Sequence, residues 1–382
     1  MSLLEIKPSV RLLKFQKMQG LSSLNGVAMF TLKPLKMPNL QKSFNIIEVI
    51  KIKIALFSEN KIKFSQVYTP SVLEKLGAYG KVSPRIDKSN IENYKEFLND
   101  CEIAFATWGM PQFTEAEIRK YMPNIKALFY SAGTVQYFAK PFLDCGIKVF
   151  SAFSANGVPV AEYTVSQIVL ALKGYFQGAK RYKSFLSYSF IHTQNCIGVY
   201  GSKVGLIGLG AIGSAVADKL KDYDVFVYAY DPFVKEERAN ELGVTLCDIE
   251  TIFKECDVIS NHLANKKELK NIFNGKLFKL MKSHSTFINT GRGDQVNEFA
   301  LAKSLIFHPS RTAVVDVLKN ETVPFTSPLF WCPNAIITPH IAGSLGNETE
   351  RMADYMIEQF DNYINGKPTQ YEITNSMLET MA

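Results

Sequence analysis

Three charged residues that lie far apart in the chain each follow a predicted β-strand: Arg292, Glu321 and His340. An Arg can hold a carboxylate through two parallel hydrogen bonds, which a Lys cannot match. A protonated His can donate to a carbonyl oxygen, and a neighbouring Glu orients the ring and favours its charged form. This combination suits hydride transfer to the carbonyl carbon of a 2-oxo acid.

A glycine-rich segment, KVGLIGLGAIGSA at 203–215, predicts a dinucleotide-binding loop. Gly208, Gly210 and Gly213 form G-x-G-x-x-G between an apolar strand and a predicted helix. The first glycine permits a tight turn, the second lets a pyrophosphate approach the backbone, and the third lets the helix pack on the strand. The phosphates would then meet free N–H groups at the start of the helix.

The next predicted strand ends at Asp231, eighteen residues after Gly213. A carboxylate at this place accepts hydrogen bonds from the ribose hydroxyls of adenosine and repels a 2′-phosphate. Pro232 and Phe233 follow it, with no Arg to bind that phosphate. The sequence therefore predicts NAD as the cofactor in preference to NADP.

Two blocks of alternating strands and helices must position these residues. The first block predicts strands Lys51–Phe57, Glu102–Thr107, Ile125–Ser131 and Ile147–Phe153, and helices Pro70–Leu76, Glu92–Asn99 and Thr114–Tyr121. The second predicts six strands: Val204–Gly208, Val225–Asp231, Asp257–His262, Thr286–Thr290, Thr312–Val317 and Ala335–Pro339. Long amphipathic helices at Pro159–Tyr182 and Gly346–Asn365 bracket the second block. Because ligands bind at the carboxyl ends of parallel strands, the three charged residues are expected to converge there.

These patterns predict an α/β fold with two doubly wound parallel-sheet domains. A Rossmann NAD-binding domain at 157–342 is expected to be inserted into a smaller flavodoxin-like substrate domain formed by 50–156 and 343–382.

The net charge of +7 is unevenly distributed. The first 50 residues hold seven basic and two acidic residues, so they contribute +5, and the remaining 332 contribute only +2. We therefore expect no nucleic-acid surface on the globular part. No apolar run approaches the roughly 18 residues of a membrane span, and the six cysteines lack zinc-site spacing, so we expect a cytoplasmic protein without a metal site.

Residues 1–49 are predicted to form a basic N-terminal extension, in which hydrophobic residues show only a weak periodicity. Three explanations stay open: a poorly ordered or artefactual arm, an ordered structural arm, or a targeting segment. The stretch is not typical of a secretory signal, because no clean apolar core precedes a small-residue cleavage site.

Four segments together resemble the D-isomer-specific 2-hydroxyacid dehydrogenase family over roughly residues 51–366. They are VAEYTVSQIVLAL at Val160–Leu172, VGLIGLGAIG at Val204–Gly213, INTGRGDQVNEFAL at Ile288–Leu301 and ITPHIAGS at Ile337–Ser344. This chain departs from the family pattern at three places. Ala264 replaces the Pro of an H-x-P that often ends the third strand, TVQYF follows Gly133 where G-x-D is expected, and the leader before residue 50 has no counterpart. The second departure leaves the identity of the substrate open.

The resemblance implies that Arg292 binds the substrate carboxylate and that His340, paired with Glu321, is the acid/base. It implies a substrate loop at Ser131–Val135, with Asp231 on the adenosine ribose and Asp316 on the nicotinamide amide. The substrate-binding set expected with Arg292 is Ala132, Gly133 and Thr134. The cofactor-binding set is Gly208, Gly210, Ala211, Ile212, Gly213, Asp231, His262, Leu263, Thr290, Gly291, Asp316, His340 and Gly343.

Members are typically dimers that pair through the nucleotide domain, so a homodimer is expected. An alternative is an NAD(H)-sensing interaction protein like the corepressors built on the same scaffold. The formate dehydrogenase branch is disfavoured, because it pairs its histidine with an uncharged Gln where Glu321 stands here.

Overall fold

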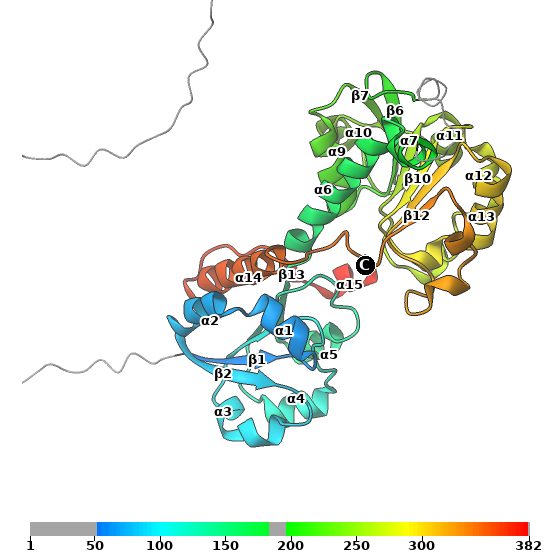
Figure 1. Ribbon diagram of the computed structural model, residues 1–382. Coiled ribbons are helices and arrows are strands. Elements are labelled where there is room, and N and C mark those ends of the chain that lie inside the picture. Colours follow the sequence, from blue (N-terminus) through cyan, green and yellow to red (C-terminus); the bar gives the residue numbers. More distant parts are fainter. Residues whose placement is uncertain (1–51, 183–195, 381–382) are drawn as a thin grey trace, which may run out of the picture. The chain divides into compact units, whose positions relative to one another are not determined.

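The computed structural model describes residues 52–182 and 196–380. Within this part of the chain, two mainly parallel sheets each have helices on both faces, which confirms the predicted fold class (Figure 1). The predicted basic extension at 1–49 lies outside the described residues.

The first sheet has six strands in the order β13-β5-β4-β3-β1-β2. Its five parallel strands follow the flavodoxin-like order 2-1-3-4-5, and β13 adds an antiparallel edge on β5. The strands are β1 (Ile52–Phe57), β2 (Gly80–Ile86), β3 (Ile103–Ala106), β4 (Ala127–Tyr130), β5 (Lys148–Ser151) and β13 (Glu372–Ile373). The antiparallel edge means that the chain returns to this sheet after building the second one.

Two apolar cores lie on the two faces of the first sheet. One face packs against helices α1 (Lys61–Val67), α2 (Pro70–Gly77) and α14 (Glu348–Ile364). The other packs against η1 (Ile91–Tyr94), α3 (Lys95–Asn99), α4 (Glu115–Tyr121), α5 (Ala139–Asp144) and α15 (Asn375–Thr380). A capping box at Thr114 and Glu117 starts α4, which confirms the helix predicted at Thr114–Tyr121.

The second sheet has seven parallel strands in the order β12-β11-β10-β9-β6-β7-β8. In chain order this is 3-2-1-4-5-6-7, the Rossmann arrangement with one strand added. The strands are β6 (Ser202–Ile207), β7 (Val225–Tyr230), β8 (Thr245–Leu246), β9 (Val258–Asn261), β10 (Thr286–Asn289), β11 (Thr312–Val315) and β12 (Ala335–Ile337).

Helices cover both faces of the second sheet as well. One face packs against α6 (Phe153–Leu172), α7 (Tyr175–Tyr182), α9 (Ala211–Leu220) and α10 (Glu236–Leu242). The other packs against α11 (Ile249–Glu255), α12 (Gly275–Leu280) and α13 (Glu298–Phe307). Short 3-10 turns η2 (Lys267–Leu269), η3 (Gly293–Gln295), η4 (Pro324–Thr326) and η5 (Pro328–Trp331) complete the connections.

Several predictions about the elements were wrong. The four strands predicted for the first block omitted β2 and the two-residue β13, and the predicted helix Glu92–Asn99 is the 3-10 turn η1 followed by the short helix α3. The six strands predicted for the second sheet omitted β8, which is only two residues long and too short to leave a period-2 pattern. The predicted helix Pro159–Tyr182 is two helices. The first, α6, begins earlier, at Phe153, and ends at Leu172, two residues before Gly174 takes a left-handed conformation with φ 66°.

In the described part of the chain, no helix is long and apolar enough to cross a membrane.

An aromatic stack fixes the core of the first sheet. Phe129 lies fully buried, with ring centroids 4.8 Å from Phe150 and 5.1 Å from Phe105, and its edge meets Phe360 of α14 at 5.6 Å. We expect Phe129→Ala to lower the free energy of unfolding by about 3–5 kcal/mol in urea titrations, because a cavity would replace these contacts. Phe226→Ala, at a position 61% exposed, is the control and should change it by less than about 0.5 kcal/mol. Equal effects of the two variants would contradict the packing argument.

Candidate active site

Three neighbouring strands bring the predicted charged residues to one edge of the second sheet. Strands β10, β11 and β12 are adjacent and parallel, and Arg292, Glu321 and His340 follow their carboxyl ends. His340 Nδ1 lies 3.0 Å from Glu321 Oε2, and the Glu321 carboxylate acts to raise the pKa of Arg292. The structure therefore brings together the three side chains that the sequence predicted would converge.

Arg292 is half-buried and lies close enough to Glu321 to feel its charge. Burial lowers the pKa of its guanidinium, an effect that the nearby Glu321 carboxylate opposes. Its Nη1 donates to the carbonyl oxygen of Gly291 at 2.8 Å, which folds the side chain back over its own loop. A guanidinium keeps its charge even when its pKa is lowered, so an anion would meet a fixed positive group here.

His340 has an unusual backbone conformation for a residue with a Cβ. Its φ is 55°, in the left-handed region, and its N–H donates to the carbonyl oxygens of Asp316 at 2.9 Å and Thr338 at 3.0 Å. The imidazole is 52% exposed and is held through Nδ1, so Nε2 is the ring nitrogen that can serve a bound molecule.

Asp316 holds the loop on which His340 lies. The carboxylate is 2% exposed and accepts three hydrogen bonds, from Thr338 Oγ1 at 2.6 Å, Ile341 N at 2.8 Å and Ala342 N at 2.9 Å. The resemblance implied a contact of this residue with the nicotinamide amide. The structure shows instead a carboxylate whose two oxygens bind backbone and hydroxyl groups of the neighbouring loop, and the nicotinamide contact stays a prediction.

The glycine loop has the geometry that the motif requires. Gly208 has φ 95°, and a Cβ on Gly213 would lie 2.0 Å from the carbonyl oxygen of Gly208. At Gly210 no atom lies within 4 Å of where a Cβ would be, which leaves space for a pyrophosphate. No side chain caps α9, so the N–H groups at Ala211 and Ile212 are available to an anion.

Asp231 lies at the end of β7, beside this loop. Its Oδ2 accepts from Leu209 N at 2.8 Å and its Oδ1 from Phe233 N at 2.9 Å. These bonds fix the carboxylate at the rim of the glycine turn, and each oxygen keeps a second lone pair for a ribose hydroxyl.

The remaining predicted cofactor residues surround the same edge. His262 follows β9, its Nε2 lies 2.9 Å from Ser260 Oγ, and burial lowers its pKa to about 4, so it stays neutral near pH 7. Leu263 N donates to Asn261 Oδ1 at 3.0 Å, and the Thr290 hydroxyl lies 3.4 Å from that of Thr164.

The predicted substrate loop follows β4 of the first sheet. Ser151 Oγ contacts the carbonyl oxygens of Ala132 at 3.0 Å and Gly133 at 2.7 Å, which turns these carbonyls inward. Neither the N–H of Gly133 nor that of Thr134 donates to another described residue. Gly343 lies beside Asn156, whose Oδ1 accepts from Ser344 N at 3.1 Å.

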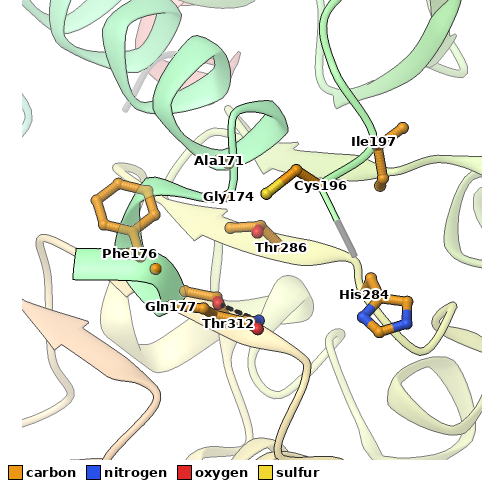
Figure 2. Close-up of a pocket in the computed structure, with 10 residues that line it drawn as sticks. Ala171, Gly174, Phe176, Gln177, Cys196, Ile197, His284, Thr286 and Thr312 are labelled. Atoms are coloured by element: carbon orange, nitrogen blue, oxygen red, sulfur yellow. Dashed lines mark hydrogen bonds between the residues drawn. The ribbon is translucent and has the colours of Figure 1, made fainter. Parts of the chain in front are cut away.

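A hollow at the opposite edge of the second sheet is separate from this site. It has a volume of about 30 Å³ and lies at the amino ends of β10 and β11, where Thr286 and Thr312 line it (Figure 2). Gln177 Nε2 donates to Thr312 Oγ1 at 3.0 Å, and both residues line the hollow together with His284, as Figure 2 shows. Over the described ranges, no group of three or more His, Cys, Asp or Glu could hold a metal ion.

Sequence reasoning missed three amide side chains at the carboxyl edge: Asn261, Asn289 and Gln295. Each is almost completely buried and hydrogen-bonded to at least one of the other two. A signal was present for two of them, because VISN and TFIN both end a buried strand with an Asn, and a buried amide must find hydrogen-bond partners.

Comparisons with known proteins agree with this arrangement. Residues 167–342 match the family model described as D-isomer specific 2-hydroxyacid dehydrogenase, NAD binding domain. A Staphylococcus haemolyticus protein named as a 2-hydroxyacid dehydrogenase is 30% identical over 260 residues, which cover 67% of this chain and 81% of that protein. D-3-phosphoglycerate dehydrogenase of Archaeoglobus fulgidus is 30% identical over 241 residues, which cover 61% of this chain and 44% of that protein.

The chain thus spans less than half of that phosphoglycerate dehydrogenase, and 40% of the one from Synechocystis sp.. Among solved structures, an NAD-complexed D-isomer specific 2-hydroxyacid dehydrogenase from Lactobacillus delbrueckii ssp. bulgaricus has a TM-score of 0.67 at 22% identity. It covers 84% of this chain and 100% of its own, and at this identity it supports the fold alone. The family match and the relative from Staphylococcus haemolyticus show that this chain, with its NAD-binding domain, belongs to the D-isomer-specific 2-hydroxyacid dehydrogenase family.

Proposed function

We propose that this protein is an NAD-dependent D-2-hydroxyacid dehydrogenase that acts on a small 2-oxo acid or its 2-hydroxy form. The observation that carries the proposal is the cluster of Arg292, Glu321 and His340 at the ends of three adjacent strands, with His340 Nδ1 3.0 Å from Glu321. No shared sequence segment forces these residues together, so their convergence supports a common task.

Each residue of the cluster has a separate role in the proposed reaction. Arg292 binds the substrate carboxylate through two parallel hydrogen bonds, assisted by the N–H groups of Gly133 and Thr134. Bound NADH supplies a hydride to C2 of the 2-oxo acid. His340 donates the Nε2 proton to the carbonyl oxygen, which becomes the hydroxyl, and Glu321 stabilises the charged imidazole beforehand. A proton donor positioned in this way contributes on the order of a hundredfold to ten-thousandfold in rate.

The cofactor would be held by residues of the second sheet. Gly210 and the start of α9 would hold the pyrophosphate, and Asp231 would bind the adenosine ribose. The remaining parts of the cofactor would be bordered by His262, Leu263, Thr290, Gly291 and Gly343. Asp316 would fix the His340 loop beside the nicotinamide.

A phosphorylated substrate would need basic residues of the first block, for which the candidates are Lys81, Arg85 and Lys140. Arg85 pairs with Asp87 at 2.7 Å and Lys140 with Asp144 at 3.0 Å, whereas Lys81 lies 5.9 Å from the centre of the Phe97 ring, so the substrate panel includes both phosphorylated and unphosphorylated acids. We further propose that residues 50–156 together with 343–382 form the substrate domain and that residues 157–342 form the nucleotide domain. We also propose that the protein is a homodimer whose subunits pair through the nucleotide domain.

A panel of 2-oxo acids tests the proposed function with the full chain. Oxidation of NADH, followed by its nicotinamide absorbance, should occur with at least one of glyoxylate, hydroxypyruvate or pyruvate. A phosphorylated 2-oxo acid is included in the panel as the competing substrate class. NADPH should serve at least about tenfold less well, because Asp231 repels the 2′-phosphate. Tight NADH binding without any turnover would instead favour the NAD(H)-sensing interaction protein.

Arg292→Lys tests the carboxylate anchor. A Lys keeps the charge but loses the paired bonds, so we expect the KM of the best 2-oxo acid to rise at least about tenfold and kcat to fall as well. Arg238→Lys, at an exposed residue paired with Glu241, is the matched control and should leave both constants unchanged. Unchanged kinetics in Arg292→Lys would remove the proposed role.

His340→Gln tests the proton donor. We expect kcat to fall about a hundredfold or more, while the Kd of NADH, measured by fluorescence titration, stays near that of the wild type. The exposed His284, at the other edge of the sheet, provides His284→Gln as the control. Activity retained by the first variant would exclude His340 as the acid.

A further inference from the structure

We infer that Asn261, Asn289 and Gln295 form a positioning network that fixes the loop of Arg292 against the loop beside the glycine turn. The inference rests on the proposed function, in which Arg292 anchors the substrate. None of the three residues was assigned a role by the motifs, and none touches the expected position of the reacting atoms.

The network is buried and each of its polar side-chain atoms is hydrogen-bonded. Asn261 and Asn289 are 0% exposed and Gln295 is 1% exposed. Asn261 Nδ2 donates to Asn289 Oδ1 at 2.9 Å and to Gln295 Oε1 at 2.7 Å. Because Asn261 and Asn289 are register partners on β9 and β10, this bond crosses directly between the strand ends. Each of the six side-chain amide N and O atoms makes at least one hydrogen bond.

One side of the network holds the backbone around Arg292. Asn289 Oδ1 accepts from Gly291 N at 3.1 Å, and Asn289 Nδ2 donates to the carbonyl oxygen of Arg292 at 3.2 Å. A Cβ at Gly291 would lie 2.7 Å from Asn261 Nδ2, so the network packs directly against this backbone. The anchor thus projects from a segment with little freedom to shift.

The other side holds the loop after β9. Gln295 Nε2 donates to the carbonyl oxygens of Ala264 at 2.7 Å and Leu263 at 3.3 Å, and Asn261 Oδ1 accepts from Leu263 N. The preceding residue, His262, has its carbonyl oxygen 2.8 Å from where a Cβ of Gly208 would be. The three amides therefore tie the Arg292 loop to the segment that packs on the glycine turn.

Directional bonds explain why amides occupy these buried places. Apolar side chains of similar size would fill the same volume but would leave the neighbouring loops free to slide. A fully satisfied polar network specifies one arrangement of its partners, whereas losing one member leaves other buried groups unbonded. A displacement of about 1 Å at a substrate anchor can cost on the order of a hundredfold in rate.

Gln295→Leu, studied in the full chain, tests the inference. At saturating NADH we expect kcat/KM for the best 2-oxo acid to fall roughly tenfold to a hundredfold, with the Kd of NADH changed less than about threefold. Gln359→Leu is the matched control, because Gln359 is 2% exposed and accepts from Gln370 N in a core on the first sheet. It should lower Tm similarly and leave kcat/KM within about twofold. Equal changes of kcat/KM in both variants would overturn the inference.

Hydrogen exchange provides a readout that needs no turnover. Amides of 289–295 should exchange faster in Gln295→Leu than in the wild type, while those of β6 and β7 stay unchanged. If the wild type reduces no 2-oxo acid, the proposed function fails. The exchange rates over 289–295 then decide by themselves whether the network holds the loop. Unchanged exchange over 289–295 would overturn the inference in either case.

A second variant covers the case in which Gln295→Leu does not fold. Asn261→Leu combined with Gln295→Leu replaces both members of the 2.7 Å pair by apolar groups, so no amide N–H of this pair is left facing an apolar side chain. The double variant also removes the acceptor of Leu263 N, so it should recover only part of the lost Tm. We expect this double variant to keep the tenfold or larger loss of kcat/KM and the faster exchange. Wild-type kcat/KM in a stable double variant would overturn the inference.

Discussion

The buried carboxylate of Asp316 is the constraint on which the candidate site depends. It binds Thr338 Oγ1 and the N–H groups of Ile341 and Ala342, so the chain after β12 must turn tightly around it. That turn places His340 in a left-handed conformation that L-residues rarely adopt, and the three hydrogen bonds offset the strain. Glu321 then orients a ring whose backbone is already fixed.

Much of the fold and the central cluster could be predicted, because both depend on features that are local in sequence. The Gly208 turn, the acid at Asp231 and the charged residues after β10, β11 and β12 follow from spacing alone once the strands are recognised. The two-residue β8 could not, since so short an edge strand is defined by its pairing with β7. The break after Leu172 was hidden because residues on both sides of Gly174 continue the helical pattern.

The contacts between loops could not be predicted from the sequence for a different reason. Asn289 and Gln295 lie on either side of Arg292, but their bonds to Asn261 depend on the parallel register of β9 and β10. Burial turns these ordinary polar residues into directional constraints, because an amide away from water must find partners. The role of Asp316 likewise became visible only when its burial and its donors were known together.

The antiparallel pairing of β13 with β5 has a consequence for biosynthesis. About 220 residues separate Ser151 from Glu372, and a ribosome adding about 5–20 residues per second needs roughly 10–45 s to make them. Throughout that interval the open edge of β5 offers unpaired N–H and C=O groups to any extended chain nearby. The nascent first sheet is therefore exposed to mispairing until the second sheet has been synthesised.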